Sequence, residues 1–431
     1  MSLYGSLYTG VAGLSANARA MSNTSTNIAN VNTVGYKSTR NEFSTLLASA
    51  NAGSYSGGIK NISMPQVSGQ GDLLQTSSPT DLAITGQGFF VVTQTPLDSP
   101  SIDEVAYTRA GTFQKDSSGF LRNASGYYLQ GWALDADGNI PTNANDLSII
   151  DLGQVNGTAM PTSTVALRAN LQSSATVTGS YTAGDIANGT VDPQFETSME
   201  FFDAQGGARP IRMAFVKTAA NTWQYELIYD GNLADIGGAT SNPIASGTMT
   251  FNADGSLATP AAAVNVTIPF VASSGLTSQT IAFNLGTAGG ADGFTQFDTT
   301  STLYGRDING TLYGGLSGVR IDDRGFVIAQ FTNGIETPLY KLPIATFLNT
   351  DGLGPVNGNT YRHTVESGSP SLKSAEEGGA GKISSRAIEQ STVDIAKEFS
   401  DMIVIQRAYS AASKIISTTD EMLDELTRLK R

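Results

Sequence analysis

Few side chains in this sequence could carry out catalysis or bind a metal. The 431 residues include no cysteine and one histidine, His363. A zinc site built on thiolates or on several histidines is therefore excluded, and a nucleophilic triad could use only His363 as its base. Because the surrounding stretch NTYRHTV is typical of a loop, we interpret His363 as a surface or packing residue.

One segment resembles a metal-binding loop. Residues 135–139 read DADGN, like the start of a calcium loop, and Asp146 falls at the closing twelfth position. The sixth position, where such a loop needs glycine for its sharp turn, is Ile140, and Pro141 follows. The sequence therefore favours a plain hairpin turn over a calcium site.

Two other patterns point to no definite chemistry. Residues 86–88, GQG, resemble the start of a dinucleotide-binding loop, but a strand-like run follows and the third glycine is absent. Acidic side chains could pair for glycoside hydrolysis, yet nothing in the sequence singles out two of them. We therefore predict no catalytic, cofactor-binding or metal-binding residues, no cofactor and no enzymatic activity.

The charge is unevenly distributed along the chain. The formal net charge is −13, and charged residues make up only 15% of the chain. Residues 72–381 carry 13 basic and 29 acidic side chains, a net charge of −16. An acidic middle argues against a nucleic-acid partner and is typical of a well-solvated outer surface.

The C-terminal region has the strongest helical pattern. Residues 391–430 contain neither proline nor glycine, and apolar residues alternate at spacings of three and four, as in a coiled-coil seam. Ser391 with Asp394 resembles a capping box at the helix start. One track of the seam is Ile395, Met402, Tyr409, Ile416 and Leu423, and the other is Ile405, Ala412, Thr419 and Leu426. Outside the seam, Phe399, Ile403, Met422 and Leu429 form a second candidate contact face.

The N-terminal region has a matching but weaker pattern. Three glycines, each costing about 1 kcal/mol relative to alanine, predict a helix that needs a partner. The C-terminal helix is the obvious partner, either as a hairpin capping the middle of the chain or as a pair that packs against pairs from other copies. The residues of this seam are Tyr4, Leu7, Val11, Leu14, Ala18, Met21, Ser25 and Ile28.

The middle of the chain predicts β structure. From about 72 to 370, strand-like runs such as LAIT and FFVVT are separated by acid–glycine turns at 116–119, 135–138, 252–255 and 322–325. We therefore predict an α+β multidomain protein. Its long terminal helices pair as an inner coiled-coil-like rod, and its middle domains are antiparallel, β-rich and barrel- or sandwich-like.

Neither a signal peptide nor a membrane span is predicted. The N-terminus lacks a basic segment followed by an apolar one, and no stretch approaches the ~20 apolar residues of a membrane helix. This pattern alone predicts a cytoplasmic protein, but a chain exported without a cleaved signal would look the same.

Four segments resemble the bacterial flagellar rod and hook protein family. STNIANVNTVGYK at 25–37 resembles its N-terminal signature, and DLAITGQGFFVV at 81–92 resembles its core segment. YTRAGTFQKDSSGFLRNASGYYLQGW at 107–132 is similar to the continuation of that core, and residues 395–430 are similar to the C-terminal helix. Within the family the chain looks most like the hook subunits, because SMEFFDAQGGARPIRMAFV resembles the start of their inserted outer domain.

The resemblance implies a division of the chain and roles for its ends. The terminal helices of many copies would form a tube around a central channel, with the apolar residues above and Phe399 as inter-subunit contacts. The connecting-arm signature would be Asn27, Asn30, Asn32, Gly35, Tyr36 and Lys37, where Gly35 supplies a turn and Tyr36 anchors against a neighbour. The implied domains are an inner helical axial domain (1–29 with 388–431), an extended connecting arm (30–70 with 360–387), an inner β domain (71–165 with 296–359) and an outer inserted β domain (166–295).

The implied function is structural. Copies would assemble helically into a curved, flexible tube that transmits torque from the motor rod to the filament, outside the cell. Implied partners are further copies, the distal rod protein, the hook cap, the hook–filament junction protein and the flagellar type III export apparatus. Two alternatives remain: a distal rod or junction protein, and a secreted β-rich binding or glycan-active protein.

Overall fold

A computed structural model describes residues 3–50, 53–96, 98–135, 137–143, 145–237 and 242–429. The chain divides into two compact units. The first comprises Met1–Val155, Gly318–Gln330 and Glu336–Arg431, and the second comprises Asn156–Ser317 and Phe331–Ile335. The second unit is wider than the predicted outer domain, 166–295, because strands on both sides of that range pair within it.

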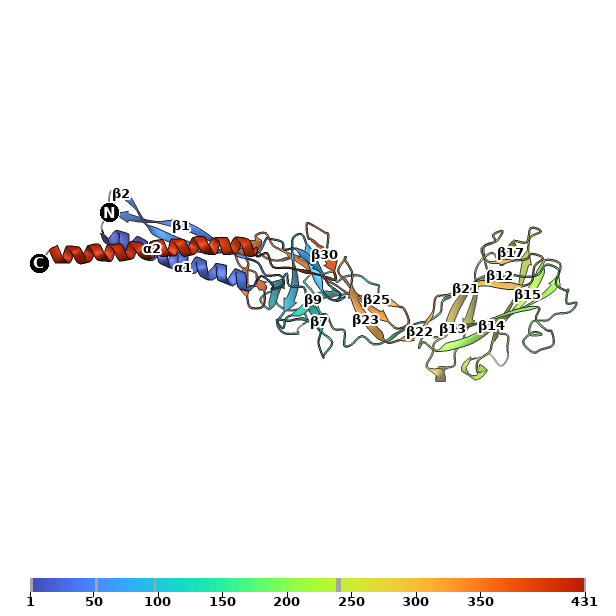
Figure 1. The fold of residues 1–431 in the computed structure, drawn as a ribbon. Coiled ribbons are helices and arrows are strands. Elements are labelled where there is room, and N and C mark those ends of the chain that lie inside the picture. Colours follow the sequence, from blue (N-terminus) through green and yellow to red (C-terminus); the bar gives the residue numbers. More distant parts are fainter. Residues whose placement is uncertain are drawn as a thin grey trace. The chain divides into compact units, whose positions relative to one another are not determined.

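Both chain ends are helical, and the two helices lie side by side (Figure 1). They are α1 (Leu3–Ala29) and α2 (Ile395–Leu429). The predicted cap of α2 at Ser391 is wrong. Asp394 caps the helix instead, because its Oδ1 accepts hydrogen bonds from the backbone N–H groups of Ala396 at 2.8 Å and Lys397 at 3.2 Å.

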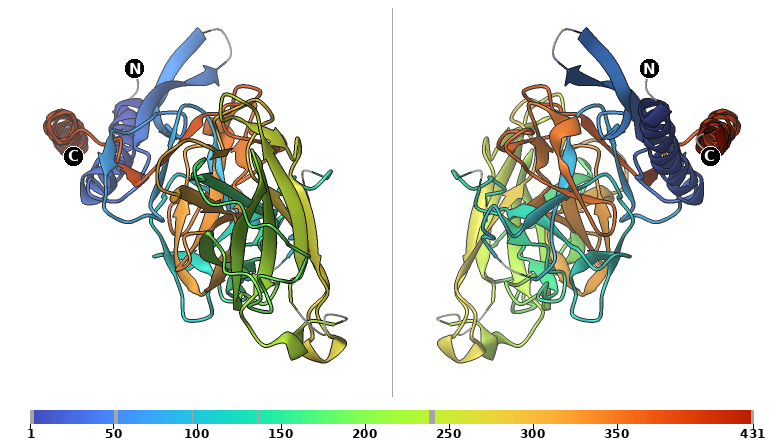
Figure 2. Two further views of the ribbon diagram at one scale, coloured as in Figure 1. Left: turned by 90° about the vertical axis from the view of Figure 1, so that its right-hand side faces the viewer. Right: turned by 90° about the vertical axis from the view of Figure 1, so that its left-hand side faces the viewer.

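A long β-hairpin packs on the other side of α1 (Figure 2). Its strands are β1 (Thr39–Ala50) and β2 (Gly53–Pro65), in register from Thr39 opposite Pro65. The structure therefore differs from the extended arm predicted for 30–70. The hairpin has little apolar alternation and is fixed to α1 by polar side chains: Asn61 Nδ2 donates to Ala16 O, and Asn41 Nδ2 donates to Ala20 O, each at 3.3 Å.

The β region of the first unit is built around one branched sheet. Its core contains Phe90, Phe113, Val327 and Ile344, all fully buried. The main strand order is β23 (Leu316–Ile321), β24 (Phe326–Phe331), β25 (Glu336–Lys341), β9 (Tyr128–Ala133), β5 (Phe89–Thr93), β6 (Val105–Thr108), β28 (Thr360–Arg362) and β27 (Gly354–Val356). Joined to it are β7 (Phe113–Lys115), β8 (Leu121–Asn123), β10 (Ser148–Ile149), β26 (Ile344–Thr346) and β29 (Ser371–Lys373).

Two short strand pairs bring the chain ends to this β region. Strand β3 (Leu73–Gln75) pairs with β31 (Ala387–Glu389), which lies just before α2. Strand β4 (Leu82–Thr85) pairs with β30 (Lys382–Ser385). Segments from opposite ends of the sequence are therefore neighbours where the helices leave the β region.

The second unit has its own core between two sheets. Trp223, Phe215 and Phe294 are fully buried in it. One sheet contains β13 (Phe195–Phe202), β14 (Ala208–Ala219), β15 (Thr222–Tyr229), β16 (Ala245–Phe251) and β17 (Leu257–Thr259). The other contains β12 (Thr164–Asn170), β18 (Val264–Ile268), β19 (Gln279–Asn284), β20 (Phe294–Thr295) and β21 (Thr302–Ile308), and β11 (Thr158–Met160) pairs with β22 (Thr311–Gly314).

The fold is α+β with long terminal helices and a β-rich middle, which confirms the predicted class. One detail differs from the prediction of antiparallel sheets, because β12 is parallel to both β19 and β20.

The DADGN turn is a local structure: Asp135 Oδ1 accepts the backbone N–H groups of Asp137 at 3.0 Å and Asn139 at 2.8 Å. That carboxylate is held by its own turn.

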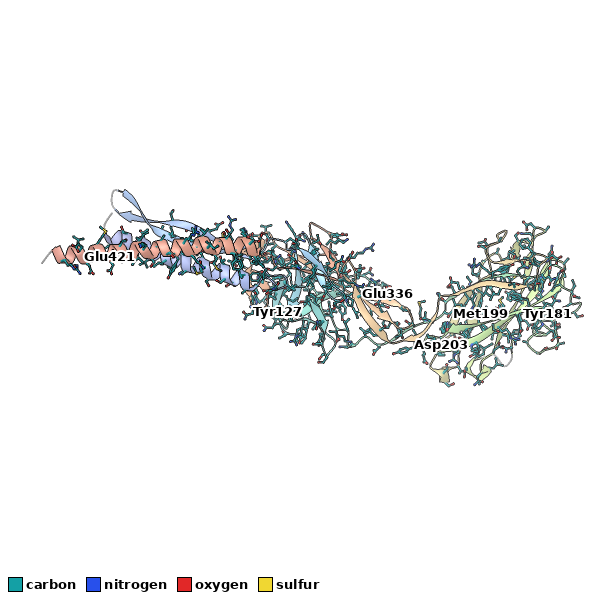
Figure 3. All side chains as sticks on the ribbon, viewed as in Figure 1. Tyr127, Tyr181, Met199, Asp203, Glu336 and Glu421 are labelled. Carbon is teal, nitrogen blue, oxygen red and sulfur yellow. The ribbon has the colours of Figure 1, made fainter. Side chains whose placement is uncertain are left out.

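A buried carboxylate fixes a loop across the first sheet of the second unit. Glu226, on β15, is fully buried. It accepts the Tyr181 hydroxyl at 2.7 Å and the backbone N–H groups of Gly184 at 2.7 Å and Ala187 at 2.8 Å. Tyr181 is labelled in Figure 3. These hydrogen bonds converge on one side chain, which ties the loop around 181–191 to β15.

Replacing Glu226 with alanine should therefore destabilise the second unit. Several part-buried donors would lose their partner, and we expect the free energy of unfolding to fall by about 2–4 kcal/mol. Urea unfolding followed by Trp223 fluorescence, in a Trp132→Phe background, measures the change. The exposed Glu200→Ala variant is the control, and equal midpoints for the two variants would contradict the assigned role.

Candidate assembly site

The buried face of α1 consists of small and polar residues. Gly10 and Gly13 lie against α2, where an added Cβ at Gly10 would come within 2.9 Å of Ile416 Cγ1. Glycine therefore allows the two helices to approach closely. The buried residues of α1 are Gly10, Gly13, Ala16, Asn17, Ala20, Thr24 and Asn27.

The predicted apolar seam of α1 is not its contact with α2. Tyr4 is 73% exposed and Val11 is 51% exposed. Leu7, Leu14, Met21 and Ile28 are half-buried. The reason is steric: the side of α1 with glycine and alanine fits between α2 and the hairpin, which leaves Tyr4 and Val11 facing outward.

Helix α2 is most buried along its second predicted track, and Ile416 of the first track also lies against Gly10 of α1. Ile405, Ala412 and Thr419 are buried, and Met402, Ile416 and Leu423 are half-buried. The remaining predicted positions are exposed, namely Ile395, Phe399, Tyr409 and Leu426. Ile403, Val404 and Met422 are exposed as well, while the side chain of Leu429 is outside the described residues. The helix pair therefore carries apolar side chains on its outer surface.

A groove of about 430 Å³ lies between the hairpin and the first turns of α2. Phe43 and Val404, both exposed apolar residues, line it together with Arg40, Lys397 and Asp401. Glu398 also lines the groove, and burial raises the pKa of its carboxyl group. The groove thus adds a mixed apolar and charged surface to the outer face of the helices.

Asn27 organises the end of α1. Its side chain is buried, and its Nδ2 donates to Thr39 O and to Glu398 Oε1, each at 2.9 Å. Its Oδ1 accepts the Thr39 N–H at 3.0 Å and the Tyr36 hydroxyl at 3.1 Å. Tyr36 is therefore held within its own chain, and its predicted contact with a neighbouring copy stays a prediction.

The rest of the arm signature forms a compact turn. Asn30 Nδ2 donates to Thr26 O at 2.9 Å, while Asn32 is exposed. Gly35 has φ 68°, and an added Cβ would lie 2.6 Å from Ala110 N. The left-handed backbone and the missing side chain are both needed here, which agrees with the predicted turn at Gly35.

Lys37 enters a buried charge cluster. Its ammonium group pairs with Glu389, whose second carboxylate oxygen lies 3.1 Å from Arg109 Nη1. Burial lowers the pKa of Lys37, and the Glu389 charge opposes that shift. Sequence reasoning found Lys37 but missed Glu389 and Arg109, because no local pattern marks residues that meet only in the folded chain.

Four models of flagellar rod and hook protein families match the chain, in the order expected from the resemblance, and they place it in the class of flagellar axial proteins. They are the flagella basal body rod protein (residues 7–37), the flagellar hook protein FlgE/F/G D1 domain (83–157), the flagellar basal body protein FlaE D2 domain (170–311) and the flagellar basal body rod FlgEFG protein C-terminal (384–429).

Full-length relatives narrow the class to one family. The chain is 36% identical to the flagellar hook protein FlgE of Rhizobium meliloti and 32% identical to that of Caulobacter vibrioides, with 100% of both chains covered in each case. It therefore belongs to the flagellar hook protein FlgE family. A crystal structure of Helicobacter pylori FlgE2 is 16% identical with a TM-score of 0.47, covering 72% of this chain and 98% of that one.

Two further properties concern the described residues alone. No helix among them is long and apolar enough to cross a membrane. In the same residues, no three acidic or histidine side chains gather in a way that could hold a metal ion.

Proposed function

We propose that the chain is a non-enzymatic structural subunit that assembles helically with further copies into the flagellar hook. The observation that carries this proposal is the outward apolar surface of a helix pair whose inner face is already filled. Tyr4, Tyr8 and Val11 on α1 are exposed, as are Phe399 and Ile403 on α2. Exposed large apolar side chains on both helices favour burial against another protein.

The inter-subunit contacts of the proposed polymer come from the terminal helices. In the proposed polymer, the exposed apolar residues of α1 and α2 contact other copies. The half-buried apolar residues of the two helices lie where two helix pairs would meet. The proposed packing residues remain Tyr4, Leu7, Val11, Leu14, Met21, Ile28, Ile395, Phe399, Met402, Ile405, Tyr409, Ala412, Ile416, Leu423 and Leu426. Those of the inner face, such as Ile405 and Ala412, act indirectly by holding α2 against α1.

The polymer would be a flexible tube with a central channel, located outside the cell, that transmits torque from rod to filament. The proposed partners at its ends are the distal rod protein, the hook cap and the hook–filament junction protein. Export would use the flagellar type III apparatus. The four matched models and the full-length hook relatives support this proposal over a glycan-active protein.

Electron microscopy of basal bodies from a strain lacking this gene tests the proposal. We expect complete rods that end without a hook, and restoration of hooks by the intact gene. Missing rods would make the chain a rod protein, and hooks without filaments would make it a junction protein. Normal flagella would refute a role in the axial structure.

A further inference from the structure

One buried carboxylate joins four separate segments of the first unit. Glu389, in β31, has a fully buried side chain that pairs with Lys37 and, at 3.1 Å, with Arg109. The same carboxylate accepts the Gly71 N–H at 2.8 Å, and the Glu389 carbonyl accepts the Gly35 N–H at 2.8 Å. The segment after α1, the segment after the hairpin, the end of β6 and the strand before α2 thus meet at one residue.

The two cations in this cluster have no other charged partner among the described residues. Lys37 Nζ otherwise donates to Gly69 O. Arg109 donates to Ile84 O at 3.2 Å and Gly86 O at 2.7 Å, and its guanidinium carbon lies 5.1 Å from the centre of the Phe89 ring. Both side chains are almost fully buried, so without Glu389 two positive charges would remain buried beside neutral groups.

The members of the cluster are far apart in the sequence. Glu389 lies 352 residues after Lys37 and 280 residues after Arg109. Lys37 follows the end of α1 at Ala29, and Glu389 precedes the start of α2 at Ile395. The cluster therefore closes only after nearly the whole chain is present, at the point where both helices leave the β region.

We propose that Glu389 makes docking of residues 30–38 onto the β region conditional on the C-terminal strand β31. Before β31 has paired with β3, Lys37 and Arg109 lack their counter-charge, and residues 30–38 stay detached from the β region. Once Glu389 is in place, its carboxylate holds the segment after α1 and the strand before α2 together. Glu389 is thus a positioning residue for the helix pair, and only its consequence for assembly rests on the proposed function.

Hydrogen exchange on the full-length monomer tests this role through the Glu389→Gln variant. Glutamine keeps the shape and an acceptor for Gly71 but removes the charge. We expect amide exchange in residues 30–38 and 69–75 to accelerate by about a hundredfold or more. Exchange in β5 and in the second unit, and the fluorescence of Trp132 and Trp223, should not change. Glu377→Gln, at an exposed acid on the loop after β29, is the matched control.

A second variant separates charge from general packing. Glu389→Asp keeps the charge on a shorter side chain and should recover part of the lost protection. Equal exchange in Glu389→Gln and the unmodified protein would overturn the proposal. So would an Asp variant no better than Gln, or exchange that rises throughout the first unit. Assembly of the unmodified protein is scored separately, so failure of the proposed function would be visible as an intact monomer that never polymerises.

Discussion

Replacing Val11 with aspartate should abolish polymerisation of the purified protein while leaving its thermal unfolding unchanged. Val11 is 51% exposed on the outer side of α1, so a charge there is solvated in the monomer. In the proposed polymer the same charge would be buried without a partner in every copy, at a cost of several kcal/mol per contact. We expect the critical concentration to rise by more than about a hundredfold.

Sedimentation at increasing protein concentration measures this effect. Val11→Leu, which keeps the position apolar, is the matched control and should assemble like the unmodified chain. A Val11→Asp protein that polymerises at the normal concentration would show that the outward side of α1 does not contact other copies.

Replacing Ile416 with aspartate should remove both helix pairing and assembly. Ile416 is half-buried and packs against Gly10 of α1. A carboxylate at this position would be desolvated against the neighbouring backbone, and α1, with its glycines, is a weak helix without its partner. We therefore expect a loss of helical circular dichroism in addition to the loss of polymer.

The β units report whether this effect is local. Trp132 and Trp223 lie in the cores of the first and second units, and their fluorescence should stay native in Ile416→Asp. Ile416→Val retains an apolar side chain and should preserve both helix content and assembly. Normal polymers formed by the aspartate variant would refute the assignment of this residue to the helix contact.

The two substitutions differ in what they do to the monomer. Val11→Asp should leave helix content intact because it changes an outward side chain. Ile416→Asp should reduce helix content because it changes the contact between helices. Together they separate the surface that joins copies from the surface that joins the two ends of one chain.

Much of this fold could be predicted from local patterns. The proline-free run of α2 and its seven-residue repeat predicted both the helix and the buried track of Ile405 and Ala412, and the acid–glycine turns predicted the β-rich middle. The turn at Gly35 was implied by the family resemblance, and its left-handed backbone agrees. These features depend on residues that are close together in the sequence.

The features that were not predicted all depend on contacts between segments that are far apart in the sequence. The surface of α1 that contacts α2 was assigned to apolar side chains. The close contact instead uses Gly10 and Gly13, because a residue without a side chain lets the two helices approach. The hairpin was missed because Asn41 and Asn61 bond to α1 instead of following an apolar alternation. The role of Glu389 depends on its contact with Lys37, which lies 352 residues earlier in the sequence, so no local pattern could predict it.

A high-resolution helical reconstruction of the assembled polymer is the most direct test of the proposed assembly. We predict that the terminal helices line a central channel and that Tyr8 and Val11 of each copy pack against helices of its neighbours. A polymer in which these side chains face solvent, with contacts made only by the β units, would contradict the proposed role of the helix pair.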